Sequence, residues 1–355
     1  AVHRAVVGRR GPARAAPPTA RRARRRRRAA GARRFPGGVG SSVLASMTAD
    51  RLASRTLELI DIASESRHEQ ALAAHVLAVL RDGGVDARDA GDACVVAGSG
   101  PVVLAGHLDT VPAQGNRPGR RDDATVHGLG AADMKGALAV MIELALAGAP
   151  YRCVFFPREE LPWSESALTP LLEREPALRD TPLAIVMEPT GNALHAGCVG
   201  NINARLVAHG RSGHSARPWL ADNAIHRLAK AVRAVADEPH VEREFEGLTF
   251  VEAMSVTQIS GGIAQNVIPD RAEAHLNYRY APGTSPEQAE RRVAEVAAGV
   301  DVEVFSNAPS GAVPRAGNPV VARLRAMGLA WEPKQAWTPV AEFARAGVDA
   351  GNFGP

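Results

Sequence analysis

Three short apolar segments of this 355-residue chain each end in residues that could bind a metal or move a proton. The segments are VVLAGHLD, CVFFPREE and LAIVMEP, and their polar ends supply His107 and Asp109, Glu159 and Glu160, and Glu188. The carboxyl ends of strands in an open α/β sheet border the crevice where ligands bind. We therefore expect these five side chains to converge on one site.

His107 and Asp109 are two residues apart at the end of a predicted strand. Residues i and i+2 of a strand point to the same side, so both can face one site while Leu108 packs away from it. A carboxylate near a metal-binding imidazole can fix the proton on its other ring nitrogen. The adjacent Glu159 and Glu160 point apart, which suits one metal ligand and one proton acceptor.

Asp133 follows the glycine-rich stretch GLGAAD and opens a predicted helix. Taken alone it has two interpretations, a helix N-cap, for which Asp is favoured, or a further ligand. Together with the residues above it favours a site for divalent cations. Imidazole and several carboxylates suit zinc and tolerate cobalt or manganese. Two such ions can share a carboxylate and a water, generating hydroxide near neutral pH.

The chain from Met47 alternates amphipathic segments with short apolar ones, which is typical of an α/β fold. Between residues 198 and 302 the pattern changes to strands of alternating polarity around one helix, which predicts a small inserted α+β domain. We therefore predict a mixed-sheet catalytic domain from residues 47–197 plus 303–355, with residues 198–302 inserted. No GxSxG, HExxH, GxxxxGK[ST] or post-strand GxGxxG motif is present.

The charge of the chain is unevenly distributed. Residues 1–46 contain thirteen arginines and no acidic residue, whereas the remainder has 29 basic against 38 acidic residues. We expect residues 1–46 to be disordered and to lie outside the native protein, which would begin at Met47; a transit peptide or a nucleic-acid-binding arm are the alternatives. The acidic remainder argues against a nucleic-acid partner.

Membrane and secretory classes are disfavoured as well. No stretch approaches the roughly 20 apolar residues that a membrane helix needs. The three cysteines are widely separated and odd in number, so they predict neither a disulfide framework nor a zinc motif, and a reducing cytoplasm fits best.

Seven motifs in this order resemble those of the succinyl-diaminopimelate desuccinylase and acetylornithine deacetylase family of di-zinc amidohydrolases. They are GHLDTVP, GLGAADMKGALAVMI, FFPREE, MEPT, GCVGN, GRSGHSARP and GGIAQNVIPD. The resemblance extends from Met47 to the C-terminus. It implies two zinc ions per subunit, with His107 and Glu188 on one, Glu160 on the other and Asp133 bridging. It also implies that Asp109 supports the site and that Glu159 is the general acid/base.

The resemblance further implies that residues 198–302 form a lid through which two subunits dimerise. His214 would reach the site of the other subunit and stabilise the tetrahedral oxyanion, while Asn266 and Arg279 would hold a small N-acyl amino acid substrate. On the residues alone, a surface-loop histidine is the simpler interpretation of His214. The stretches PREELP, MEPT and HSARPWLADNAI are most similar to desuccinylases of the actinobacterial type.

That subgroup implies hydrolysis of N-succinyl-LL-2,6-diaminopimelate to succinate and LL-2,6-diaminopimelate, a step in lysine and cell-wall synthesis. Deacylation of acetylornithine, or a related aminoacylase or peptidase activity, is the alternative. The family carries its last metal-binding histidine shortly after a stretch similar to NFGP, so we expect the coding sequence to supply it within about a dozen residues after Pro355. The alternative is that the protein is an inactive relative of these enzymes, which binds one metal or a partner but catalyses no reaction. The family's GWTD reads AWTP here, which puts substrate contacts of Thr338 in doubt.

Overall fold

The computed structural model describes residues 48–355. The arginine-rich residues 1–46, for which we predict disorder, lie outside this range. Within it, the search for a helix long and apolar enough to cross a membrane finds none.

The larger of the two main sheets is mixed and has eight strands. Its order is β1 (Ala87–Asp89), β2 (Val95–Ala97), β6 (Tyr151–Phe156), β3 (Val102–His107), β7 (Leu183–Val186), β17 (Ala350–Asn352), β8 (Leu194–Ala196) and β16 (Trp331–Pro333). The central strand β3 runs parallel to β6 and β7. Its six residues are all buried, which explains the continuous apolar run in the sequence.

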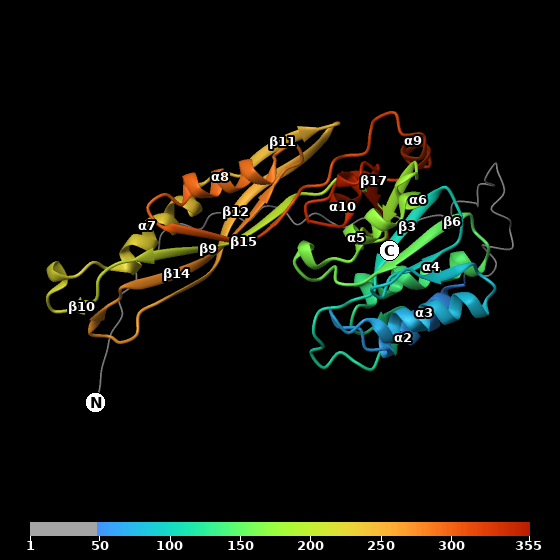
Figure 1. Ribbon diagram of the computed structural model, residues 1–355, viewed down its shortest axis with the longest axis horizontal. Coiled ribbons are helices and arrows are strands. Elements are labelled where there is room, and N and C mark those ends of the chain that lie inside the picture. Colours follow the sequence, from blue (N-terminus) through green and yellow to red (C-terminus); the bar gives the residue numbers. More distant parts are fainter. Residues whose placement is uncertain (1–47) are drawn as a thin grey trace, which may run out of the picture. The chain divides into compact units, whose positions relative to one another are not determined.

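Helices cover both faces of this sheet (Figure 1). One face packs Leu104 and Phe155 against α2 (Ala49–Asp61), α3 (Gln70–Asp82), α4 (Gly136–Leu146) and α9 (Pro319–Ala326). The other packs Val103 and Phe156 against α5 (Leu168–Arg174), α6 (Pro176–Arg179) and α10 (Val340–Arg345). A sheet buried on both faces has functional groups only at its edges and strand ends.

A second, antiparallel sheet has five strands in the order β11 (Val241–Phe245), β12 (Leu248–Gly261), β14 (Arg271–Tyr280), β9 (Gly200–His209) and β15 (Asp301–Ala308). One face packs on α7 (Ala224–Asp237) and α8 (Pro286–Val296) through residues such as Leu206, Leu228 and Leu276. The alternate positions of β9 and β14 are polar or half-exposed. This sheet therefore has an open polar face.

Short elements complete the described chain. They are β4 (Arg120–Arg121) with β5 (Val126–His127), β10 (Gly213–His214) with β13 (Val267–Ile268), and the single turns η1 (Ala131–Lys135), η2 (Trp163–Glu165) and η3 (Pro218–Leu220).

Two sequence-based boundaries need correction. Asp133 does not open a helix, because α4 begins at Gly136 and Asp133 has non-helical dihedral angles in the turn before it. The boundary predicted between residues 302 and 303 falls inside β15, which pairs with β9 from Asp301 to Ala308. Its alternating sequence was assigned to the returning catalytic segment, but strand pairing, which the local sequence does not encode, adds it to the five-stranded sheet.

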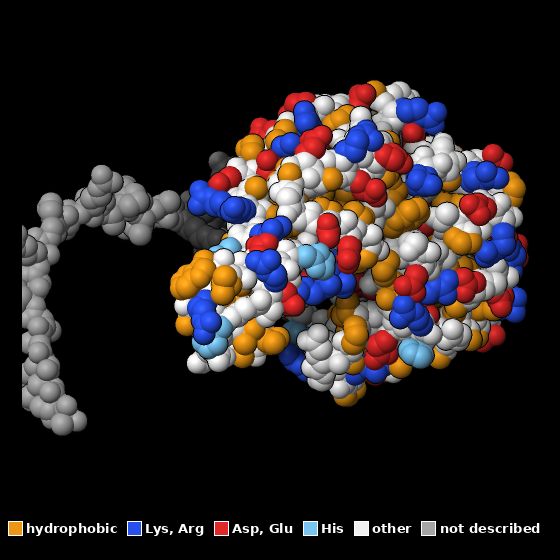
Figure 2. Space-filling view, turned by 60° about the vertical axis from the view of Figure 1, so that its left-hand side comes forward, with side chains coloured by type: hydrophobic (Ala, Val, Ile, Leu, Met, Phe, Trp, Pro, Cys, Tyr) orange, Lys and Arg blue, Asp and Glu red, His pale blue; other side chains and the backbone are white. Residues whose placement is uncertain are grey.

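Opposite charges are interspersed on the surface shown in Figure 2. Exposed ion pairs among the described residues include Arg233 with Asp237 on α7 and Arg205 with Glu303 between β9 and β15. Exposed pairs of this kind each contribute only about 0–1 kcal/mol to stability.

Candidate metal centre

The ends of β3, β6 and β7 lie side by side. In the sheet register His107 pairs with Phe156, and Ala105 pairs with Val186. The chain therefore leaves β6 toward Glu159 and Glu160, and leaves β7 toward Glu188, at the edge where β3 delivers His107. Parallel pairing of three strands is the physical reason that residues distant in sequence meet here.

His107 lies at the centre of the cluster and is 1% exposed. Its Nε2 atom is 3.0 Å from Asp133 Oδ1 and 3.8 Å from Glu188 Oε1, and its Nδ1 atom is 2.9 Å from the backbone oxygen of Asp109. Two donor groups share His107, one with Asp133 and Glu188 and one with Glu159 and Glu160. Within each group, the candidate ligand atoms lie within 4.8 Å of one another.

Asp109 holds the turn that follows β6. Its Oδ1 accepts the backbone N–H of Glu159 at 2.9 Å, and its Oδ2 accepts the N–H of Glu160 at 3.0 Å and the hydroxyl of Ser66 at 2.8 Å. Burial would raise the pKa of the Asp109 carboxyl, but His107 and these hydrogen bonds hold it below its usual value. Asp109 is therefore a charged carboxylate that positions the two glutamates.

Asp133 faces His107 from the turn before α4. The residue at the N-cap of α4 is Lys135, which makes no side-chain capping bond, so the structure gives Asp133 no capping role. Its side chain is half-exposed. Burial is the largest influence and acts to raise the pKa of Asp133, but the hydrogen bond to His107 and the charges of His107 and Lys334 together keep that pKa below its usual value.

The surroundings of Glu159, Glu160 and Glu188 disfavour their charged forms, so the pKa of each carboxyl is raised. Burial, and then the charge of Glu188, raises the pKa of Glu159 well above its usual value. Burial likewise raises the pKa of Glu160, and it raises that of Glu188 to about 7. Glu188 Oε1 is buried without a hydrogen-bond partner among the described residues. An unpartnered buried carboxylate oxygen beside other carboxylates is what a divalent cation would satisfy.

The protonation of His107 agrees with this interpretation. Burial alone would lower the pKa of the imidazole, but Asp109 and Asp133, followed by the glutamates, raise it well above its usual value. A proton on His107 thus supplies part of the positive charge that the carboxylates require. A divalent cation could replace that proton, because metal ligands must bind deprotonated. The residues present therefore fit divalent cations.

The three predicted substrate contacts lie in the five-stranded sheet and its loops. His214 is exposed in β10, and Asn266 lies beside it, because the N–H of Ser215 donates to the Asn266 backbone oxygen at 3.0 Å. Arg279 is half-buried in β14, where its Nε donates to Asn277 Oδ1 at 3.0 Å. None of the three belongs to either donor group of the metal centre.

Three further residues at the site were not identified from the sequence. Ser66 bonds to Asp109 from the loop between α2 and α3. Lys334 donates from Nζ to the Pro189 backbone oxygen at 3.2 Å, and its charge helps to lower the pKa of Asp133. Arg158 directly precedes the two glutamates, and this position is the only sequence feature that could have identified it as part of the site.

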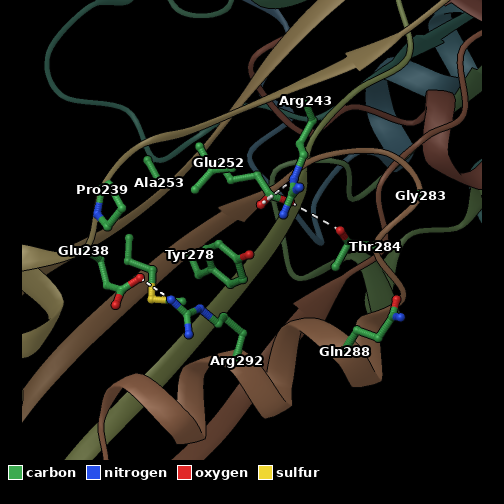
Figure 3. A pocket seen from close by; sticks show the side chains of 12 residues that line it. Glu238, Pro239, Arg243, Glu252, Ala253, Tyr278, Gly283, Thr284, Gln288 and Arg292 are labelled. Atoms are coloured by element: carbon green, nitrogen blue, oxygen red, sulfur yellow. Dashed lines mark hydrogen bonds and ion pairs between the residues drawn. The ribbon is translucent and has the colours of Figure 1, made fainter.

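A pocket of about 420 Å³ in the five-stranded region has four charged groups among its twelve lining residues, and these four pair with one another (Figure 3). Glu252 accepts from Arg243 at 3.3 Å and from the Ala281 N–H at 3.1 Å. Arg292 pairs with Glu238 at 2.5 Å. No histidine or cysteine is among its lining residues. This pocket therefore offers neither a free base nor a metal-ligand set.

Comparison with known proteins gives one family match, a peptidase dimerisation domain over residues 197–304. A Mycobacterium tuberculosis protein provisionally named succinyl-diaminopimelate desuccinylase is 39% identical over 312 residues, which cover 84% of this chain and 88% of that protein. The succinyl-diaminopimelate desuccinylase of Corynebacterium glutamicum is 36% identical over 267 residues, covering 71% and 72% of the two chains.

Solved structures share the fold at low identity. An aminopeptidase of Bacillus cereus matches with a TM-score of 0.68 at 19% identity, covering 87% of this chain and 91% of its own. A dinuclear metal-binding peptidase of the M20 family from Bacillus subtilis matches with a TM-score of 0.57 at 16% identity, covering 85% and 87%. These matches confirm the predicted α/β fold with an inserted second domain.

Proposed function

Because the chain belongs to the family of succinyl-diaminopimelate desuccinylases and related metal-dependent amidohydrolases, we propose that it hydrolyses the succinyl amide of N-succinyl-LL-2,6-diaminopimelate. The products are succinate and LL-2,6-diaminopimelate. The observation that carries the chemistry is the convergence of His107 with four carboxylates at three strand ends and one turn. The substrate is inferred from the names of the two curated relatives described above.

We assign His107 and Glu188 to one metal ion, Glu160 to a second, and Asp133 to a position between them. The unpartnered Oε1 of Glu188 and the two donor groups that share His107 support this assignment. Bound divalent cations polarise an amide carbonyl and lower the pKa of water. We propose zinc as the resident metal, since imidazole and carboxylate ligands suit it, with cobalt or manganese as replacements.

Glu159 is the proposed general acid/base. Burial raises the pKa of Glu159, which makes its carboxylate a stronger base than an ordinary glutamate and suits a group that takes a proton from water and delivers it to the departing amine nitrogen. The backbone N–H of Glu159 donates to Asp109, which fixes the position of the Glu159 backbone. This contact would keep the Glu159 carboxylate at the site during the reaction. Asp109 itself transfers no proton, because its low pKa keeps it ionised.

The five-stranded domain is proposed to form a homodimer and to complete the site. The match of residues 197–304 to a peptidase dimerisation domain supports the dimer. In that assembly His214 of one copy stabilises the oxyanion at the site of the other, and Asn266 and Arg279 hold the substrate. The cytoplasm is the proposed location, which is consistent with three buried free cysteines among the described residues.

The decisive test compares the hydrolysis of two substrates by the purified protein. Succinate release from N-succinyl-LL-2,6-diaminopimelate should exceed acetate release from acetylornithine, and it should stop when a chelator removes the metal. Metal analysis of the active protein identifies the resident ion. Turnover of acetylornithine alone would overturn the substrate, and full activity without metal would overturn the mechanism.

A further inference from the structure

Arg158 begins the turn that carries Glu159 and Glu160, and the proposed reaction gives it no role. Its backbone has a φ of 65°, in the left-handed region that residues other than glycine adopt rarely. Such a conformation costs on the order of 1 kcal/mol and persists only where surrounding contacts hold it. The contacts that hold Arg158 are therefore informative.

The guanidinium of Arg158 binds two acceptors from different parts of the chain. Nη1 donates to Asp92 Oδ1 at 2.8 Å, and Nη2 bonds to Asp92 Oδ2, so the pair is bidentate. Nε donates to the backbone oxygen of Glu165 at 2.7 Å. The Arg158 side chain is only 21% exposed. Bidentate pairs of arginine and carboxylate fix orientation as well as distance.

Asp92 presents its carboxylate from a tight turn between β1 and β2. It also has a left-handed φ of 54°, and the turn is closed by the Gly91 N–H, which donates to Asp89 Oδ1 at 2.8 Å. The β1–β2 hairpin, at the edge of the eight-stranded sheet, is thereby tied to the turn after β6. On its other side the same turn is held by Asp109, through the N–H groups of both glutamates.

We propose that Asp92 and Arg158 are positioning residues, which clamp the turn after β6 so that Glu159 and Glu160 face His107. The catalytic part of this inference rests on the proposed function, whereas the clamp itself rests on the contacts above. Asp109 anchors the turn from the side of the site, and Arg158 anchors it from the outside. Loss of the outer anchor would leave the two N–H bonds to Asp109 as the remaining restraint among those described here.

Asp92→Asn is the variant that tests the clamp. Asparagine has the same size and accepts a left-handed backbone, so the change removes the charge and one of the two acceptors without disturbing the hairpin turn. In the full, metal-free chain, hydrogen exchange measured by mass spectrometry should be about tenfold faster at the amides of Glu159 and Glu160. With metal and substrate, kcat should fall about tenfold or more, with KM within twofold.

Two further variants make the result specific. Glu175→Gln breaks the ion pair with Arg88, which joins the same hairpin to a different segment at 2.7 Å, and it should change neither the exchange rates nor kcat. Arg158→Lys keeps the charge but loses the planar fork, so its exchange rates should lie between those of the wild type and Asp92→Asn.

Each outcome decides a separate question. Unchanged exchange at residues 159 and 160 in Asp92→Asn overturns the clamp, whatever the activity. Faster exchange with unchanged kcat overturns the positioning role in catalysis. An inactive wild-type protein would overturn the proposed function, and the exchange measurement on metal-free protein would still decide whether the clamp exists.

Discussion

Buried carboxylates in two regions of this molecule have opposite surroundings. Glu342 on α10 is 2% exposed and accepts hydrogen bonds from the Ser166 hydroxyl at 2.9 Å and from the Thr169 N–H at 2.8 Å. Glu188, after β7, is 6% exposed, yet its Oε1 has no donor among the described residues. The protein therefore donates hydrogen bonds to both oxygens of Glu342 but leaves Oε1 of Glu188 without a donor among the described residues.

Glu342 and Glu188 cannot be distinguished by the direction in which their pKa values are shifted. Burial raises the pKa of both carboxyls, so a raised pKa alone does not identify a metal ligand. The distinguishing feature is whether the protein supplies hydrogen-bond donors for the anion. Predictions that remove a carboxylate from one region or the other therefore test the distinction directly.

The largest effect is expected for Glu159→Gln. Glutamine keeps the size of the side chain but cannot transfer a proton, so kcat should fall about 10³-fold while metal content is unchanged. Steady-state kinetics with metal analysis measures this. Glu165→Gln is the matched control, because Glu165 lies nearby but pairs with the exposed Arg67 at 2.7 Å, and it should stay within twofold of wild type. Comparable losses in both variants would contradict the assignment of Glu159.

The next effect is expected for Asp109→Asn. Both oxygens of Asp109 accept backbone N–H groups, and an amide nitrogen in place of one oxygen would oppose a donor with a donor. Metal affinity, measured by calorimetry, should fall about 10- to 100-fold, as for other groups that orient ligands. Ser66→Ala removes one hydroxyl bond to the same carboxylate and should have a smaller effect. An equal loss in Ser66→Ala would contradict the dominant role of the backbone bonds.

The convergence of most candidate metal ligands could be predicted from sequence, because all of them except Asp133 follow apolar strands. Residue type, period and the shared edge of parallel strands were sufficient to bring His107 and Glu188 together. The helix boundary at Asp133 was wrong, because a tertiary contact with His107 accompanies non-helical backbone there. The bonds from Asp109 to the glutamate amides were not predictable, since backbone donors leave no trace in residue types.

The five-stranded domain shows the other limit of sequence reasoning. His214, Asn266 and Arg279 were singled out by family resemblance, and no periodicity or spacing indicated where they would lie. β15 was placed in the wrong sheet, because the partner of an amphipathic strand depends on which edge is available. Contacts that need a second copy of the chain are beyond what one sequence specifies by pattern.

The same contrast between paired and unpaired charges applies to two arginine side chains, Arg279 and Arg205. Arg279 is half-buried, burial lowers the pKa of its guanidinium, and no carboxylate pairs with it among the described residues. Arg205, in the neighbouring strand, is exposed and pairs with Glu303 at 3.2 Å and Glu273 at 3.5 Å. If Arg279 binds a substrate carboxylate, Arg279→Met should lower kcat/KM about 10- to 100-fold, and Arg205→Met should not. Equal effects would show that Arg279 is structural.

The smallest effect on catalysis is expected for Glu342→Gln, which should change stability instead. The pKa of Glu342 is raised to about 6, mainly by burial, so its folded form prefers the proton relative to the unfolded chain. This contribution to stability is fully present below the unfolded pKa of about 4.5 and is lost as pH rises through about 6. Between pH 4.5 and 7.5, the wild type should lose about 1–2 kcal/mol of unfolding free energy that the variant does not lose.

Urea unfolding of both proteins across this pH range measures the difference, in which the titration of all other groups cancels. Hydrolysis rates at a fixed metal concentration should agree within twofold, because Glu342 is satisfied by Ser166 and Thr169 and does not belong to the metal centre. If the two unfolding curves shift in parallel with pH, Glu342 is not the buried titrating acid. If the variant instead loses metal, the distinction between satisfied and unsatisfied carboxylates fails, since a residue with a full set of donors would be supporting the site.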